Sequence, residues 1–356
     1  MDISGIIRLS NQYGKDPELV LAGGGNTSEK DERVLYIKCS GTSLATIDER
    51  GFVPVSRAAL DATLTKEYPR DDQGREAAFL ADVMAARTIP GETRRPSVEA
   101  LLHNLFPQRY VVHLHPALIN GLTCGKTGEA RLKELFGEKA IWIPVTRPGF
   151  ILGKLCYEVM REQREKTGED VRLAFLENHG IFVAADTEEE IEALVTEAVD
   201  TLKSAVTCFP EQDYMETADA AYIAQIKEKT AYSHVAFRSN PQILEFLQSS
   251  ETARDLLQAL TPDQIVYCGA APTYLTNIAA LRAKPEGKVL LVEKVGIFAL
   301  GQTEKEAHLA ALLFLDAIKI AIYARSFGGV QALPADLVAF IVNWEAESYR
   351  QQEAKR

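Results

Sequence analysis

The chain has 356 residues, 46% of them hydrophobic and 25% charged, which is typical of a soluble globular protein with one large domain or two ordinary ones. Its 39 basic and 50 acidic residues give a formal net charge of -11, so it lacks a broad cationic surface for nucleic acid or an anionic membrane. A phosphorylated small molecule is compatible with this charge, because a local cradle of hydrogen-bond donors is enough to bind it.

The chain carries no evident signal for export or membrane insertion. Its start, Met1 to Gly5, lacks the basic and apolar regions of a secretory signal, so we expect a cytoplasmic protein. The most apolar stretch, 309–324, is interrupted by Asp316 and Lys319 and is shorter than a membrane span of about 20 apolar residues. The five cysteines have no paired spacing, which predicts reduced thiols without a disulfide framework or a structural zinc cluster.

Short β-branched runs alternate with helical stretches along the chain. Residues 34–37, 110–112 and 140–143 have the composition of strands. Their alternation with residues of helical spacing predicts a layered domain of the α/β or α+β class, and it does not require a parallel sheet.

Two segments rich in glycine, serine, threonine and asparagine flank the predicted strand 34–37. Residues 22–28 read Ala-Gly-Gly-Gly-Asn-Thr-Ser, and residues 39–43 read Cys-Ser-Gly-Thr-Ser. Such loops present N–H and hydroxyl groups that can bind a phosphate, although each is also typical of an ordinary turn. We reject a dinucleotide-binding interpretation, since Ser28 replaces its third glycine and the charged residues 29–33 cannot open a buried helix.

A helix is predicted after Pro96. Ser97 can cap this helix, and Glu99 then falls in its first turn, where the partial positive charge of the helix N-terminus stabilises a carboxylate. Beside a metal ion the same carboxylate could instead carry a proton to and from carbon. His103, four residues after Glu99, is a weaker candidate for the site, and a role in helix packing or capping is favoured for it.

Three histidines follow at the ends of predicted strands. His113 and His115 alternate after residues 110–112, so their imidazoles should point to the same face. His179 stands in Asn-His-Gly after the apolar run 173–176. Scattered histidines are more often packed or exposed residues than ligands, but three imidazoles with an open coordination position are typical of a catalytic Zn²⁺ or a related divalent metal. We therefore predict a metal site.

The chain contains an internal repeat. Residues 176–187 reappear as residues 292–303, and each copy precedes a predicted helix, the first at about 188–204. Val295 replaces His179 in the second copy. The second copy is therefore predicted to keep the strands and the helix without the site.

A polar segment with a proline separates the two copies, and we place a domain boundary near residue 215. Residues 1–215 are predicted to form the catalytic domain. Residues 216–356 are predicted to form an α/β extension that contains the degenerate, metal-free repeat.

Taken in order, the motifs of this chain resemble the class II aldolase and adducin family. The motifs are GGGNTS, CSGTSLATIDERGFVPV, RRPSVEALLH, HLHP, VTRPGF and ENHGIF. Each is common alone, whereas the ordered set is specific. The resemblance covers residues 8–325 and is closest to the aldolase portion of bifunctional rhamnulose-1-phosphate aldolase/alcohol dehydrogenases. We expect the dehydrogenase half to be missing, because the chain ends in a polar tail at 345–356.

The resemblance implies a three-layer α/β/α sandwich with a largely antiparallel central sheet. It also implies a homo-oligomer, commonly a tetramer, with sites at subunit interfaces. The family's site residues correspond to His113, His115 and His179 at the metal, Glu99 as the catalytic acid and base, and Asn26, Ser40, Gly41 and Ser97 at the substrate phosphate. Val98 departs from the family pattern, in which a second serine often precedes the glutamate, so one hydrogen bond to the phosphate is expected to be missing.

The activity that the resemblance implies is metal-dependent cleavage of a ketose 1-phosphate, such as rhamnulose 1-phosphate, to dihydroxyacetone phosphate and an aldehyde. Zn²⁺ is the expected metal. Related family members epimerise or decarboxylate sugar phosphates, and the sequence does not separate these reactions. An adducin-like interaction module without catalysis is a further alternative, against which the complete set of three histidines and Glu99 argues.

Overall fold

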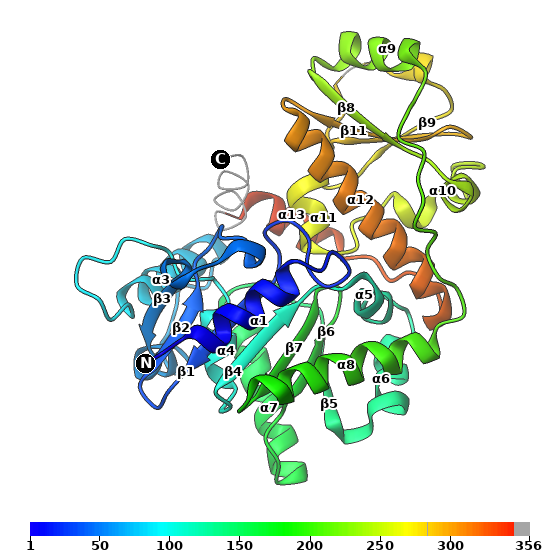
Figure 1. Cartoon of the computed structure of the whole chain (residues 1–356). Coiled ribbons are helices and arrows are strands. Elements are labelled where there is room, and N and C mark those ends of the chain that lie inside the picture. The colour runs from blue at the N-terminus through cyan, green and yellow to red at the C-terminus, as the bar shows by residue number, and fades with distance from the viewer. Residues whose placement is uncertain (283, 345–356) are drawn as a thin grey trace. The chain divides into compact units, whose positions relative to one another are not determined.

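The computed structural model describes residues 1–282 and 284–344 (Figure 1). The polar tail 345–356 therefore lies outside the described residues. The chain divides into two compact units, Met1–Ile119 with Glu129–Ser204, and Asn120–Gly128 with Ala205–Arg356. Each unit is built around a sheet of its own.

The first unit contains a seven-stranded sheet in the order β3-β2-β1-β4-β7-β6-β5. Among its described strands only β5 and β6 pair in parallel, which confirms the predicted, largely antiparallel sheet. The predicted strands at 34–37, 110–112 and 140–143 are β2, β4 and β5. The bounds are β1 Asn26–Lys30, β2 Val34–Lys38, β3 Phe52–Ser56, β4 Tyr110–Leu114, β5 Ala140–Ile143, β6 Leu173–Leu176 and β7 Gly180–Ala185.

Helices cover both faces of this sheet and complete the predicted three-layer sandwich (Figure 1). One face packs against α2 (Arg57–Thr63), α3 (Asp72–Ala85), α4 (Ala100–Leu105) and α7 (Phe150–Thr167). The opposite face carries α1 (Ser4–Gly14) and α8 (Glu188–Ala205), which are joined by the ion pair of Arg8 and Glu188. The remaining helices of this part of the chain are α5 Ala117–Thr123 and α6 Gly128–Phe136.

Strand β1 corrects one expectation, because the end of the segment predicted to be a loop, Asn26 to Ser28, is a strand. All five residues of β1 are polar and all are buried. Buried polar groups are tolerated where they have hydrogen-bond partners. Here Thr27 contacts Ser10, Ser28 contacts His103, Glu29 pairs with Arg109, and the Lys30 ammonium donates to the carbonyl oxygens of His103 and Phe106.

The second unit contains a four-stranded sheet in the order β8-β11-β10-β9. Its strands are β8 His234–Arg238, β9 Thr273–Leu275, β10 Val289–Val292 and β11 Gly296–Gly301. Its helices are α9 Ala220–Thr230, α10 Pro241–Phe246, α11 Pro262–Cys268, α12 Glu304–Ala324 and α13 Ala335–Asn343. Helix α12 is long and apolar enough to cross a bilayer, but 72% of its apolar window is buried inside the protein, as in the core helix of a globular unit.

The internal repeat includes more strands in the structure than the repeated sequence motif contains. Strands β8-β11-β10-β9 pair antiparallel, antiparallel and parallel, as β4-β7-β6-β5 do. The turns also match, since Asn178 and Lys294 both have a left-handed backbone, with φ of 59° and 56°. The second unit therefore repeats four of the seven strands of the first sheet, including a β4-like strand that the repeated sequence motif does not contain.

Candidate functional site

Two of the three histidines are placed by strand β4. His113 lies within the strand and is buried, and His115 is the first residue after it. The Nδ1 atom of His113 lies 2.9 Å from the carbonyl oxygen of Ile181 on β7. The ring of Phe182, its partner across the two strands, stacks on the imidazole with the ring centres 4.0 Å apart. His113 is thus held in one orientation by a hydrogen bond and a stacked ring.

The third histidine is placed by the turn between β6 and β7. His179 follows Asn178 and precedes Gly180, whose φ is 154°. A Cβ atom at Gly180 would lie 2.3 Å from the carbonyl oxygen of Leu114, so only glycine allows this turn to approach the end of β4. The close approach brings His179 to the two histidines of the neighbouring strand.

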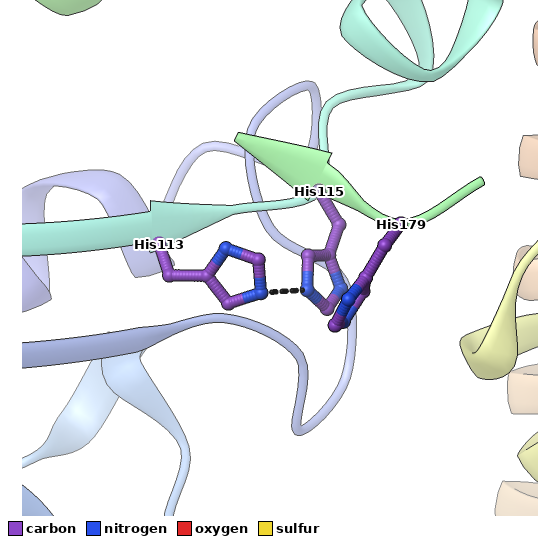
Figure 2. A group of neighbouring side chains, drawn as sticks. All are labelled: His113, His115 and His179. Carbon is purple, nitrogen blue, oxygen red and sulfur yellow. Dashed lines mark hydrogen bonds between the residues drawn. The ribbon is translucent and has the colours of Figure 1, made fainter. Parts of the chain in front are cut away.

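The three imidazoles point toward one another (Figure 2). One nitrogen of each lies within 4.8 Å of the others, and the Nε2 atoms of His113 and His115 are 2.9 Å apart. A carbonyl oxygen can only accept, so the Nδ1 atom of His113 carries the proton and its Nε2 lone pair faces the other two rings. Three nitrogen donors at one point fit a divalent metal with an open position.

Glu99 faces the same point from the position directly before the start of α4. The helix begins at Ala100, so Glu99 precedes it instead of lying in its first turn, and the backbone N–H of Glu99 donates to the Ser97 hydroxyl at 3.2 Å. Its Oε1 atom lies 3.4 Å from Nε2 of His113 and 3.7 Å from Nε2 of His179. That buried oxygen has no hydrogen-bond partner, and a cation among the histidines would compensate its charge.

The residues that the resemblance assigns to the phosphate lie on neighbouring segments. Cys39 and Pro96 form an isolated bridge, in which the N–H of Ser40 donates to the Arg95 carbonyl and the N–H of Ser97 donates to the Lys38 carbonyl. This pairing places Ser40 and Gly41 beside Ser97, although the two segments are far apart in the sequence. Gly41 is exposed and has a φ of 85°, which favours glycine at this turn.

Asn26 is on another element, at the start of β1. Its side-chain amide donates a hydrogen bond to Oε2 of Glu99. It also pairs with His113 in the register of β1 and β4. Of the four residues assigned to the phosphate, Asn26 is therefore the one that the structure brings to the carboxylate.

His103 is a packing residue, as the sequence predicted. It is fully buried, its Nδ1 atom contacts the Ser28 hydroxyl at 2.8 Å, and its ring meets the edge of Phe182. Burial keeps the pKa of His103 well below its usual value, so this imidazole is neutral. It supports Phe182, which in turn stacks on His113.

One charged residue near the glycine segment was missed at the level of sequence. Lys38, at the end of β2, is only 3% exposed, and its ammonium lies 3.5 Å from the carbonyl oxygen of Gly23. A buried cation beside loops of this composition is suited to an anionic ligand. The sequence did contain one signal, a lysine directly before the Cys-Ser-Gly-Thr-Ser segment. In a predicted strand, however, such a lysine is usually an exposed residue.

The second unit has other residues at the positions of the three histidines. Phe237 pairs with Phe298 as His113 pairs with Phe182, and Ser239 follows β8 as His115 follows β4. Val295 stands in the turn where the first unit has His179. Phenylalanine and valine offer no ligand atom, so the repeated scaffold presents an apolar pair where the first unit presents imidazoles.

Residues 5–206 match the family model described as the Class II Aldolase and Adducin N-terminal domain. A curated relative, the Uncharacterized oxidoreductase YuxG of Bacillus subtilis (strain 168), is 25% identical over 297 residues, with 76% of this chain and 42% of the relative covered. The chain thus spans about two fifths of that relative's length.

Two solved structures are also similar. The N-terminal class II aldolase domain of a conserved protein from Thermoplasma acidophilum is 29% identical, with a TM-score of 0.48, and the match covers 57% of this chain and 93% of that one. The L-fuculose-1-phosphate aldolase from Thermus thermophilus is 16% identical, with a TM-score of 0.37, over 56% of this chain and 93% of that one.

Proposed function

The chain belongs to the class II aldolase and adducin family, and from this premise we propose that it is a metal-dependent aldolase, a carbon-carbon lyase. Its proposed reaction is the cleavage of a ketose 1-phosphate, of the rhamnulose 1-phosphate type, to dihydroxyacetone phosphate and a short aldehyde. The observation that carries the proposal is the meeting of three imidazoles and the Glu99 carboxylate at one point. We further propose that the enzyme works in the cytoplasm as a homo-oligomer.

In this proposal His113, His115 and His179 hold a divalent metal, with Zn²⁺ the ion that suits three imidazoles and an open position. The metal supplies Lewis acidity to the carbonyl and the adjacent hydroxyl of the substrate. The protein's part is to keep the three rings in place. The hydrogen bond from His113 to Ile181 and the stacked ring of Phe182 do this for one of them.

Glu99 is the proposed acid and base. In cleavage the bond between C3 and C4 of the ketose breaks, the C4 hydroxyl loses its proton as the aldehyde forms, and C3 takes up a proton. A carboxylate beside the metal ligands is suited to deliver that proton to C3, and to remove it in the reverse direction. A positioned group of this kind contributes about 10²- to 10⁴-fold to the rate.

The substrate phosphate is proposed to bind at the paired segments that carry Ser40, Gly41 and Ser97, with Asn26 as the fourth residue that the resemblance assigns to it. The buried ammonium of Lys38 adds a positive charge on the strand that leads into Ser40. A C1 phosphate bound there would hold the substrate beside its C2 carbonyl, so that the carbonyl and the adjacent hydroxyl could meet the histidines. This arrangement favours a phosphorylated sugar over a neutral one.

A substrate panel tests the proposal. The purified Zn²⁺-loaded protein is incubated with ketose 1-phosphates, pentulose 5-phosphates and sugar-acid phosphates, and dihydroxyacetone phosphate, epimers and carbon dioxide are measured. We expect dihydroxyacetone phosphate from a ketose 1-phosphate, and its loss in Glu99→Gln with the metal content unchanged. Epimers or carbon dioxide instead would assign the chain to another reaction of the family. No turnover of any substrate would favour the interaction module.

A further inference from the structure

We infer that Glu177 is a positioning residue: its carboxylate fastens the turn that carries His179 to the loop 144–149, which follows β5. The inference rests on the proposed function, in which His179 is a ligand of the metal. It deepens the proposed function by naming a group that keeps the third imidazole in place.

Glu177 bonds twice to the segment that leaves the neighbouring strand. It is the first residue after β6, which pairs in parallel with β5, so the chain leaves both strands at the same edge of the sheet. The backbone N–H of Glu177 donates to the carbonyl oxygen of Ile143 at 2.9 Å, and its side-chain Oε2 atom accepts from the N–H of Val145 at 2.8 Å. The side chain thus extends the strand pairing by one hydrogen bond into the loop.

The loop 144–149 is a firm support, because helix α3 holds both its middle and the residue that follows it. The Arg147 guanidinium pairs with the Asp72 carboxylate at 2.7 Å, and the backbone N–H of Phe150 donates to Oε2 of Glu76 at 3.1 Å. Glu76 is buried, so this anchor lies inside the fold. The hydrogen bond from the turn therefore reaches a loop that is itself fastened to another layer of the protein.

The turn has more need of such support than the strand that carries the first histidine. His113 lies within β4, whose backbone pairs with β1 on one side and with β7 on the other. His179 lies in a turn after Asn178, whose left-handed backbone, with a φ of 59°, costs free energy in a residue with a side chain. Metal ligands must stay within about 0.5 Å of their productive geometry. We therefore expect metal affinity to depend on the contact made by Glu177.

The second unit repeats this turn without the histidine and holds its glutamate differently. Glu293 stands at the place of Glu177, and its N–H likewise donates to the last residue of the neighbouring strand, the carbonyl oxygen of Leu275, at 2.9 Å. Its Oε2 atom, however, accepts from the hydroxyl of Tyr274, within β9, at 2.8 Å. Among the residues that the structure describes, the bond from this turn to the following loop thus accompanies the histidine and is not made where Val295 replaces it.

Metal affinity tests this role without reference to turnover. We compare the wild type with Glu177→Ala, which removes the acceptor, and with Glu177→Gln, which keeps an oxygen that accepts from an N–H but carries no charge. The Kd for Zn²⁺ is measured by competition with a chelator, and the Co²⁺-loaded proteins are compared by their visible absorption spectra. Glu177→Ala should bind Zn²⁺ about 10-fold more weakly and show altered Co²⁺ bands, whereas Glu177→Gln should stay within about 2-fold of the wild type.

Glu293→Ala is the matched control, since it removes the equivalent carboxylate from the unit that has no histidine at this turn. Its Zn²⁺ affinity should equal that of the wild type, even where its metal-free melting temperature falls as far as that of Glu177→Ala. If Glu177→Ala does not fold, Glu177→Met takes its place, because its side chain has a similar length and offers only a weak acceptor.

Wild-type Zn²⁺ affinity and an unchanged Co²⁺ spectrum in Glu177→Ala would overturn the inference. Equal losses in Glu177→Ala and Glu177→Gln would also overturn it, because they would assign the effect to the charge and not to the hydrogen bond. A wild type that binds Zn²⁺ with the expected dependence on Glu177 but cleaves no ketose 1-phosphate would refute the aldolase reaction alone. A wild type that binds no Zn²⁺ would refute both the inference and the proposed function.

Discussion

The Nδ1 atom of His113 on β4 lies 2.9 Å from the carbonyl oxygen of Ile181, the residue on β7 before its strand partner Phe182. Because a carbonyl only accepts, this contact places the imidazole proton on Nδ1 and directs the Nε2 lone pair at His115, whose Nε2 atom is 2.9 Å away. At this distance the Nε2 atom of His115 can donate a hydrogen bond to that lone pair, or both nitrogens can share a cation. The backbone of β7 thereby holds His113 in the orientation and tautomer that the proposed metal site requires.

Replacing one ligand should remove the metal. We expect about one divalent metal per wild-type chain by elemental analysis, and nearly none for His179→Ala, because two imidazoles bind a transition metal far more weakly than three. His308→Ala, in the second unit, is the matched control and should keep its metal. Retention of metal by His179→Ala would exclude the three-histidine site.

The ring of Phe182, which stacks on His113, should affect metal binding by holding the imidazole in place. Phe182→Leu removes the face on which His113 packs, and we expect metal affinity to fall about 10-fold while the protein stays folded. Phe298→Leu makes the equivalent change in the second unit, where the partner ring belongs to Phe237. Both variants should be destabilised to a similar extent. Equal loss of metal affinity in both would show a general effect of stability and contradict a local role of Phe182.

A substitution at Val98 should strengthen binding of the substrate phosphate. Val98→Ser restores the serine that the family often carries before the glutamate, and one added hydrogen bond to a charged phosphate should lower KM about 10-fold. Val98→Ala, which shortens the side chain without a hydroxyl, is the control. An unchanged KM in Val98→Ser would place the phosphate elsewhere.

The loop that precedes Arg95 should lose stability in acid. Hydrogen bonds from the Arg94 side chain lower the pKa of Glu92 to about 2 from an ordinary value of 4.5. A carboxylate whose pKa is lowered by folding stabilises the protein above its unfolded value and loses that effect as the pH falls through the folded value. The melting temperature of the wild type should therefore exceed that of Glu92→Gln at pH 7, and the gap should close between about pH 4.5 and pH 2.

The control for this pair is Glu49→Gln, since Glu49 is exposed and makes no ion pair with any residue that the structure describes. Its melting temperature should follow that of the wild type at every pH. A gap for Glu92→Gln that stays constant down to pH 2 would mean that the charge of Glu92 does not contribute to stability.

Several local features were predictable because they depend on neighbours along the chain. The capping residues and helical spacing after Thr187 predicted a helix at 188–204, and α8 spans Glu188–Ala205. The repeat of the Asn-His-Gly turn as Lys-Val-Gly predicted two equivalent hairpins, which are β6 with β7 and β10 with β11. Strand β1 was not predictable in this way, because its polar side chains find partners on α1, on α4 and at Arg109, the residue before β4.

The sequence by itself determined which residue types are present at the site and the order of motifs that identifies the family. Only the tertiary structure decided that His179 meets His113, that Asn26 reaches Glu99, and that Phe237 stands where the second unit would need its first histidine. Each of these contacts joins segments that are distant in the chain. Their register is set by strand pairing and by burial of side chains from several elements together, which spacing along one segment does not record.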